Sequence, residues 1–140
     1  MNKETKFGKI ARELWFKAAI VSKQLDNSLG AIHGIGLAEY MVLLNLMKAP
    51  NRSLRRIDLA EALARTGSGI TRMLMPMEKI GLISKDTNAR DARVSLVKIT
   101  PAGEALFNDA SATLETKSER LLSKMDDDEA NQLLALLTAI

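Results

Sequence analysis

The order of patterns between residues 53 and 101 constrains this chain most, because two short amphipathic segments there precede a basic, β-branched stretch. Ser53 can cap a first helix, from about Leu54 to Ala64. Its apolar positions recur at helical spacing and would face inward: Ile57, Leu59, Ala60 and Leu63. The segment Arg65-Thr66-Gly67 then interrupts the pattern, which predicts a turn.

A second helix is predicted after this turn, with Thr66 as its cap and Gly81 as its stop. Its inward positions would be Ile70, Met73, Leu74 and Met77. The opposite face carries side chains at positions i, i+3, i+4 and i+7, namely Ser68, Thr71, Arg72 and Met75. On a helix that lies in a DNA major groove, this face would present two hydroxyls and a guanidinium to bases and phosphates. Met75 would either contact a thymine methyl or remain solvated.

After Gly81 the sequence predicts two strands around a charged turn, with residues 82–85 and 93–99 as the strands. Arg90 at the tip of this ribbon is a candidate for insertion into a DNA minor groove, whose negative potential attracts a guanidinium. Arg93 would contact DNA or, alternatively, pair with Asp91 and brace the loop. Helix, turn, helix and basic ribbon form the layout of a winged helix-turn-helix.

The distribution of charge supports a phosphate-binding role for this middle segment. Residues 51–100 hold ten basic and five acidic side chains (+5), residues 1–50 hold seven and four (+3), and residues 101–140 hold three and eight (−5). Positive charge is therefore concentrated on the predicted winged helix-turn-helix, which we call the reader. Arg55 and Arg56 open its first helix, where phosphate contact and ordinary solvation are both plausible readings.

Both ends of the chain are predicted to form long amphipathic helices that need a partner surface. The N-terminal apolar seam follows three- and four-residue steps, through Phe7, Ala11, Leu14, Ala18, Val21, Leu25, Leu29 and Ile32. Toward the C-terminus, Thr100 and Pro101 can start one helix, and Asp126 with Glu129 has the spacing of a capping box that starts another. A second copy of the chain is the expected cover, which predicts a homodimer.

Several classes of function find no support in the composition. The chain has no cysteine and one histidine, which excludes disulfides and thiolate metal sites and leaves too few imidazoles for a zinc site. No nucleophile motif or phosphate-cradling glycine loop is present, so we expect neither an enzyme nor a cofactor. The apolar runs are too short to span a bilayer and the first residues do not resemble a signal peptide, which predicts a cytoplasmic protein.

The motifs together resemble the MarR family of bacterial transcription regulators. The resemblance is carried by Leu59-Ala60-x-x-Leu63, Thr71-Arg72, Glu78-Lys79-x-Gly81-Leu82-Ile83, Arg90-Asp91-x-Arg93 and Thr100-Pro101-x-Gly103. The chain departs from the family pattern at Gly67 and Gly69, which flank Ser68, and at Ala38, which stands where a Ser or Thr helix cap is usual. Pro76 inside the recognition helix predicts a local kink.

This resemblance implies a mainly α fold with a small β-wing in a single domain of residues 1–140. Residues 1–34 and 101–140 would be dimerisation helices, and residues 36–100 would be the DNA-binding lobe. It further implies a dimeric regulator that binds palindromic promoter sites in double-stranded DNA. The regulator would act as a repressor relieved by a small aromatic or anionic ligand or, alternatively, as an activator. The alternative is a winged-helix protein-interaction scaffold without specific DNA binding.

A ligand pocket is implied between the dimer helices and the reader. Trp15, Phe16, His33 and Tyr40 are candidates, because stacking surfaces with a hydrogen-bonding tip suit a phenolic acid. The alternative reading is structural. The three aromatic side chains would then fill a core or dimer seam, and His33 would be a solvated residue at a helix end.

Overall fold

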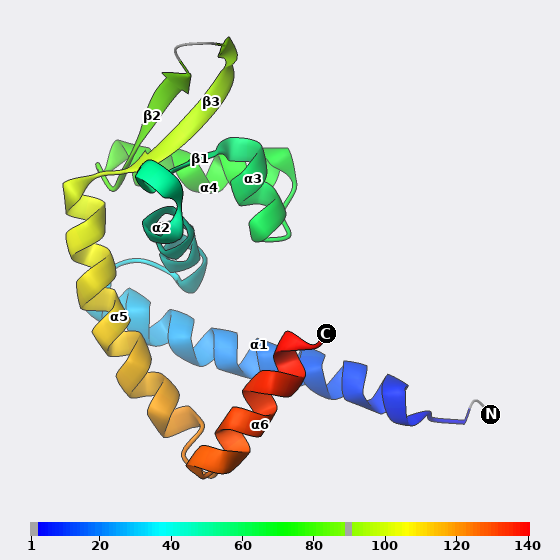
Figure 1. Ribbon diagram of the computed structural model, residues 1–140. Coiled ribbons are helices and arrows are strands. Elements are labelled where there is room, and N and C mark those ends of the chain that lie inside the picture. Colours follow the sequence, from blue (N-terminus) through cyan, green and yellow to red (C-terminus); the bar gives the residue numbers. More distant parts are fainter. Residues whose placement is uncertain (1–2, 89–90) are drawn as a thin grey trace.

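Six α-helices and a three-stranded sheet make up the part of the chain that the computed structural model describes, residues 3–88 and 91–140 (Figure 1). In chain order the elements are α1 (Lys6–His33), α2 (Leu37–Lys48), the 3-10 helix η1 (Pro50–Arg52), β1 (Ser53–Arg55), α3 (Arg56–Ala62), α4 (Gly67–Lys79), β2 (Ile83–Asn88), β3 (Asp91–Ile99), α5 (Pro101–Leu121) and α6 (Asp127–Thr138). The elements from α2 to β3 gather in one lobe, while α1, α5 and α6 form the other end of the molecule (Figure 1).

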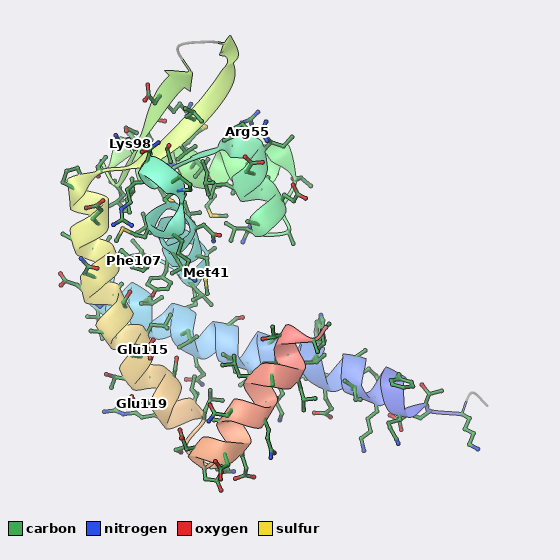
Figure 2. The ribbon with its side chains drawn as sticks, viewed as in Figure 1. Met41, Arg55, Lys98, Phe107, Glu115 and Glu119 are labelled. Carbon is green, nitrogen blue, oxygen red and sulfur yellow. The ribbon has the colours of Figure 1, made fainter. Side chains whose placement is uncertain are left out.

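The hydrophobic core lies mainly in the lobe, around α2. Val42, Leu43 and Leu46 of α2 are fully buried. They belong to one cluster with buried side chains from α3, α4 and β3, which include Leu59, Ile70, Leu74, Val97 and Ile99. Phe107 of α5 and Met41 of α2 pack against the edge of this cluster (Figure 2). The core therefore joins the helix-turn-helix to the sheet in one packed unit.

The sheet contains one strand that the sequence patterns did not reveal. β3 lies in the middle, with β1 and β2 antiparallel on either side, in the order β1-β3-β2. Ser53 pairs with Lys98, so it lies in β1 and does not cap a helix that begins at Leu54. α3 instead starts at Arg56, without a side-chain cap. The prediction was wrong because the partner strand, which satisfies the backbone groups of β1, lies more than forty residues along the chain.

The first predicted helix also differs in which side chains it buries. Leu59 and Ala60 are buried as predicted, whereas Ile57 is 67% exposed. At about 100° per residue, Ile57 lies roughly 110° from the centre of the stripe that Leu59, Ala60 and Leu63 form. Ile57 therefore points away from the core, so the predicted inward placement is wrong.

The starts of α4, α5 and α6 and the end of α4 agree with the predicted signals, whereas α2 is capped at Gly36, two residues before the cap position assigned to Ala38. Thr66 caps α4 by accepting the Gly69 N–H at 3.0 Å, and Gly81, with φ of +84°, follows its end. Thr100 caps α5, and Asp126 with Glu129 forms a complete capping box at the start of α6. These interactions join residues three apart, so local sequence is enough to predict them. α4 runs through Pro76 as one helix and ends at Lys79.

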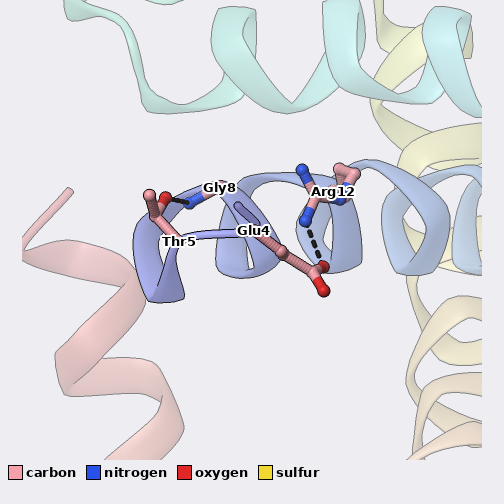
Figure 3. A network of polar contacts seen from close by, with 4 residues as sticks. All are labelled: Glu4, Thr5, Gly8 and Arg12. Carbon is pink, nitrogen blue, oxygen red and sulfur yellow. Dashed lines mark hydrogen bonds and ion pairs between the residues drawn. The ribbon is translucent and has the colours of Figure 1, made fainter. Parts of the chain in front are cut away.

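The N-terminal half of α1 and the whole of α6 do not pack into the hydrophobic core. Of the predicted α1 seam, only Leu25 and Leu29 are buried, whereas Phe7 is 81% exposed. α6 has no buried residue. The start of α1 is held by its own contacts, because Thr5 accepts the Gly8 N–H and Arg12 forms an ion pair with Glu4 (Figure 3). These helices thus expose an apolar face in the single chain.

Within the described residues, no single helix is long and apolar enough to cross a membrane. α1 and α2 pass that test only when taken together, and they are bent by 83° where they meet.

Candidate nucleic-acid interface

α4 has one buried face and one open face, as the sequence predicts. Ile70, Leu74 and Met77 are almost fully buried against the lobe core. On the other side Ser68 and Arg72 are exposed, Met75 is 58% exposed and Thr71 is half-buried. The packing that fixes the inner face therefore presents the predicted recognition residues together on the outside of the lobe.

The hydroxyl of Thr71 is already engaged inside the protein. It donates to the Gly67 carbonyl oxygen at 2.9 Å, one turn earlier on α4. It also accepts a hydrogen bond from Arg56, the first residue of α3, whose Nη1 lies 3.5 Å from the Gly67 carbonyl oxygen. Arg56 was predicted either to contact phosphate or to be solvated, and the structure places its guanidinium against the recognition helix.

The other arginines of the reader differ in their partners. Arg55, at the end of β1, donates to both carboxylate oxygens of Asp58, at 2.9 and 3.1 Å. This hydrogen bond and the charge of Asp58 raise the pKa of the Arg55 guanidinium. Arg52 forms an ion pair with Glu104 at 3.6 Å. By contrast, Arg65 and Arg72 form no ion pair with any described side chain, so they present uncompensated positive charge.

The wing, formed by β2 and β3, lies beside α4 and contacts it through an ion pair. β2 and β3 pair from Ile83 with Ile99 to Asn88 with Asp91, and Lys85 of β2 lies 3.6 Å from Glu78 of α4. Arg90, the predicted minor-groove residue, lies outside the described residues. Asp91 and Arg93 belong to β3 by backbone, but their side chains also lie outside the described set. Bracing of the loop by this pair stays a prediction.

The four residues predicted to bind a ligand do not share one pocket. Tyr40 is buried, stacks on Phe107 with ring centroids 5.1 Å apart, and its hydroxyl lies 2.8 Å from the Ser111 hydroxyl. His33 is half-buried, with Nε2 2.6 Å from Thr113 Oγ1. Both side chains thus join α1 and α2 to α5.

Trp15 and Phe16 lie elsewhere on α1. They are 68% and 54% exposed and meet edge to face at 5.2 Å. Seventeen residues of helix, or roughly 25 Å, separate Phe16 from His33. The structure therefore brings His33 and Tyr40 to the same helix junction and leaves the two aromatic residues on the open part of α1.

A different set of residues lines the crevice between α1 and the lobe. This crevice has a volume of about 630 Å³ and is lined by Ser22, Lys23, Asp26, Leu37, Ala38, Met41, Leu63 and Arg65. Its two cations come from α1 and from the turn before α4, and Asp26 is occupied in accepting the Leu37 N–H at 2.8 Å. Sequence reasoning missed this set, because its members share no period and meet only through tertiary packing.

No group of three or more His, Cys, Asp or Glu side chains among the described residues is placed to hold a metal ion.

No family model matches the sequence. Among solved structures, a MarR family transcriptional regulator from Rhodococcus sp. RHA1 has a TM-score of 0.88 at 20% identity, covering 98% of this chain and 95% of that one. A MarR family regulator from Streptomyces coelicolor in complex with DNA has a TM-score of 0.85 at 18% identity, covering 99% and 88%.

A third structure is that of a cysteine-to-serine mutant of MarR from E. coli complexed with operator DNA. Its TM-score is 0.82 at 23% identity, with coverage of 97% of this chain and 98% of that chain. These likenesses span nearly the whole of each chain. The protein therefore has the winged helix-turn-helix fold of MarR transcriptional regulators, mainly helical with a small antiparallel sheet.

Proposed function

We propose that this chain is a member of the MarR family and a sequence-specific DNA-binding transcriptional regulator. The observation that carries the proposal is the open face of α4, where Arg72 and Ser68 stand exposed beside a two-stranded wing. In the same fold, regulators from Streptomyces coelicolor and E. coli have been solved with DNA. The excess of positive charge in residues 51–100 supports the same role.

The active form we propose is a homodimer. The apolar faces of α1 and α6 are exposed in the single chain, and between them lies a groove of about 710 Å³ floored by Ile10, Leu14, Val21, Leu133 and Leu137. An apolar surface of this extent is typical of a protein interface. Two recognition helices related by a two-fold axis would read a palindromic site whose half-sites lie about 34–36 Å apart. Such a dimer would act in the cytoplasm, where the chromosome is.

We further propose that the regulator is a repressor relieved by a small aromatic or anionic ligand. The crevice between α1 and the lobe supports this, because it combines cations at Lys23 and Arg65 with apolar walls at Leu37, Met41 and Leu63. A carboxylate would pair with the cations while an aromatic ring packed on the walls. A ligand seated there would bias the angle between the lobe and α1, and with it the spacing of the two readers.

The experiment that tests the proposal is binding to DNA from upstream of the protein's own gene, with random duplex as competitor, over a series of salt concentrations. We expect one dimer to bind a palindromic site in preference to random DNA, and to bind more weakly as salt rises. Lys117→Gln, on α5 outside the reader, is the control. No preference over random duplex, for this fragment or for sites selected from a random library, would favour the protein-interaction scaffold.

A further inference from the structure

The recognition helix begins with a sequence that is poor at forming a helix. Its first three positions are Gly67, Ser68 and Gly69, and glycine loses more backbone freedom on folding than any other residue. Thr66 caps one amide of this turn, at Gly69. Two of the predicted reading residues, Ser68 and Thr71, lie in this turn or directly after it. Their placement on DNA therefore depends on how firmly the turn is held.

Arg56 supplies a tertiary contact to this turn. It lies eleven residues before Gly67 and fifteen before Thr71, on the neighbouring helix α3, and it reaches the Thr71 hydroxyl and the Gly67 carbonyl oxygen. Thr71 in turn donates to the same carbonyl oxygen at 2.9 Å. The guanidinium, the hydroxyl and the carbonyl thus form a closed triangle that ties α3 to the first turn of α4. A planar guanidinium suits this geometry, since several N–H groups point outward in one plane.

We propose that Arg56 and Thr71 are a positioning pair that locks the start of the recognition helix, and that base reading falls to Ser68, Arg72 and Met75. This inference rests on the proposed DNA-binding function. A threonine hydroxyl has one proton and two lone pairs. In Thr71 the proton is given to the Gly67 carbonyl and one lone pair accepts from Arg56. Thr71 consequently has no proton for guanine N7 or O6 or thymine O4.

A positioning role for Arg56 can be distinguished by experiment from phosphate contact, one of the two roles predicted for it. If Arg56 holds the helix, a substitution elsewhere that stiffens the turn should replace part of its effect. Gly67 offers that substitution, because an added Cβ would meet nothing within 4 Å and the residue already has helical backbone angles. Gly67→Ala should therefore favour the helical turn through the unfolded state alone.

The test measures hydrogen exchange at the amides of residues 68–72 in the free protein, for wild type, Arg56→Gln, Arg56→Lys, Thr71→Val and Arg56→Gln with Gly67→Ala. We expect exchange to be about tenfold faster in Arg56→Gln and Thr71→Val, since each removes a hydrogen bond to a charged group. Lysine lacks the planar fork, so Arg56→Lys should resemble Arg56→Gln. Gly67→Ala should recover about threefold of the loss. Arg55→Gln, whose partner is Asp58, is the matched control and should leave these amides unchanged.

DNA binding by the same variants supplies the second readout. Arg56→Gln should weaken specific binding about tenfold while leaving the slope of log affinity against log salt unchanged. A lost phosphate contact would reduce that slope by about 0.9. Thr71→Val should weaken binding without altering the preferred sequence, whereas Arg72→Gln should alter it at one position in each half-site.

Two outcomes would overturn the inference. One is unchanged exchange in Arg56→Gln. The other is a salt slope reduced by about one contact in Arg56→Gln with full binding retained by Arg56→Lys, which would make Arg56 a phosphate contact. Failure of the proposed function looks different, because wild type would then prefer no DNA sequence at all. The exchange experiment needs no DNA, so it decides the positioning role in that case also.

Discussion

The lobe and the outer helices of this protein are stabilised in different ways. In the lobe, α2, α3, α4 and the sheet bury their apolar faces against one another, and Val42, Leu43 and Leu46 are wholly inaccessible. In the outer region, α6 buries nothing and the first half of α1 exposes most of its apolar side chains. The lobe is therefore complete within one chain, whereas the outer helices have caps and periodicity but lack a partner surface.

The two regions constrain function in different ways. The open face of α4 is held by a finished core, so a single chain is enough to organise the proposed DNA-binding surface. The groove between α1 and α6 has no such support, and in the proposed homodimer a second chain would cover it. α5 joins the two regions, since its first half packs on the lobe core through Phe107 and its second half continues toward α6 (Figure 2).

The largest effect is expected where α5 meets the lobe, at Gly103. A Cβ there would overlap the Leu82 carbonyl oxygen and lie 2.8 Å from Ile99 Cγ1. We expect Gly103→Ala to lower the free energy of unfolding by about 3 kcal/mol, because backbone must move to admit the methyl group. Urea unfolding followed by circular dichroism measures this change.

The matched control is the same substitution at Gly30 of α1, which has open space around it. Gly30→Ala should stabilise the protein by about 0.5–1 kcal/mol through helix propensity. Equal effects at the two glycines would contradict the tight junction between α5 and the lobe.

The next effect concerns the outer helices. Leu134 of α6 is 64% exposed in the single chain, so Leu134→Glu should leave the lobe folded and weaken the dimer at least about tenfold, because a charge would be buried at the interface. Sedimentation velocity over a range of protein concentrations measures the dissociation constant. Lys124→Gln, in the loop before α6, serves as the control. An unaltered dimer in Leu134→Glu would place the interface elsewhere.

The open face of α4 gives the next effect, which should be limited to DNA binding because the core of the lobe is unchanged. Arg72→Ala should weaken binding to the preferred site by about 1–3 kcal/mol, while the dimer and the unfolding free energy stay as in wild type. Titration of labelled duplex, with Arg120→Ala of α5 in parallel, checks this. If Arg72→Ala binds the site as tightly as wild type does, the assigned recognition face is wrong.

The smallest effect is local strain in the turn between α3 and α4. Ala64 has φ of +52°, a left-handed conformation that glycine adopts more readily than alanine. We expect Ala64→Gly to raise the free energy of unfolding by about 0.5 kcal/mol, since the relief of strain slightly exceeds the added flexibility of the unfolded chain. Ala62→Gly, at the last residue of α3, should instead lower it by up to about 1 kcal/mol. Thermal unfolding of the two variants distinguishes these signs.

Features that depend on neighbouring residues could be read from the sequence. The caps at Thr66, Thr100 and Asp126, the stop at Gly81 and the two faces of α4 follow from contacts within one or two helical turns. The same patterns, in their order along the chain, were sufficient to predict a winged helix-turn-helix between two sets of longer helices, which the structure and the solved MarR regulators confirm as the fold.

Other features required residues that are distant along the chain to meet. β1 forms because Ser53 pairs with Lys98 of β3. The crevice between α1 and the lobe forms because α1 lies against the turn before α4. Tyr40 stacks on Phe107 because packing brings α2 against α5, and Arg56 reaches Thr71 because α3 packs beside α4. Hydrophobic periodicity specifies which face of an element is buried, but not which element covers it. That choice is made by the collective packing of the core.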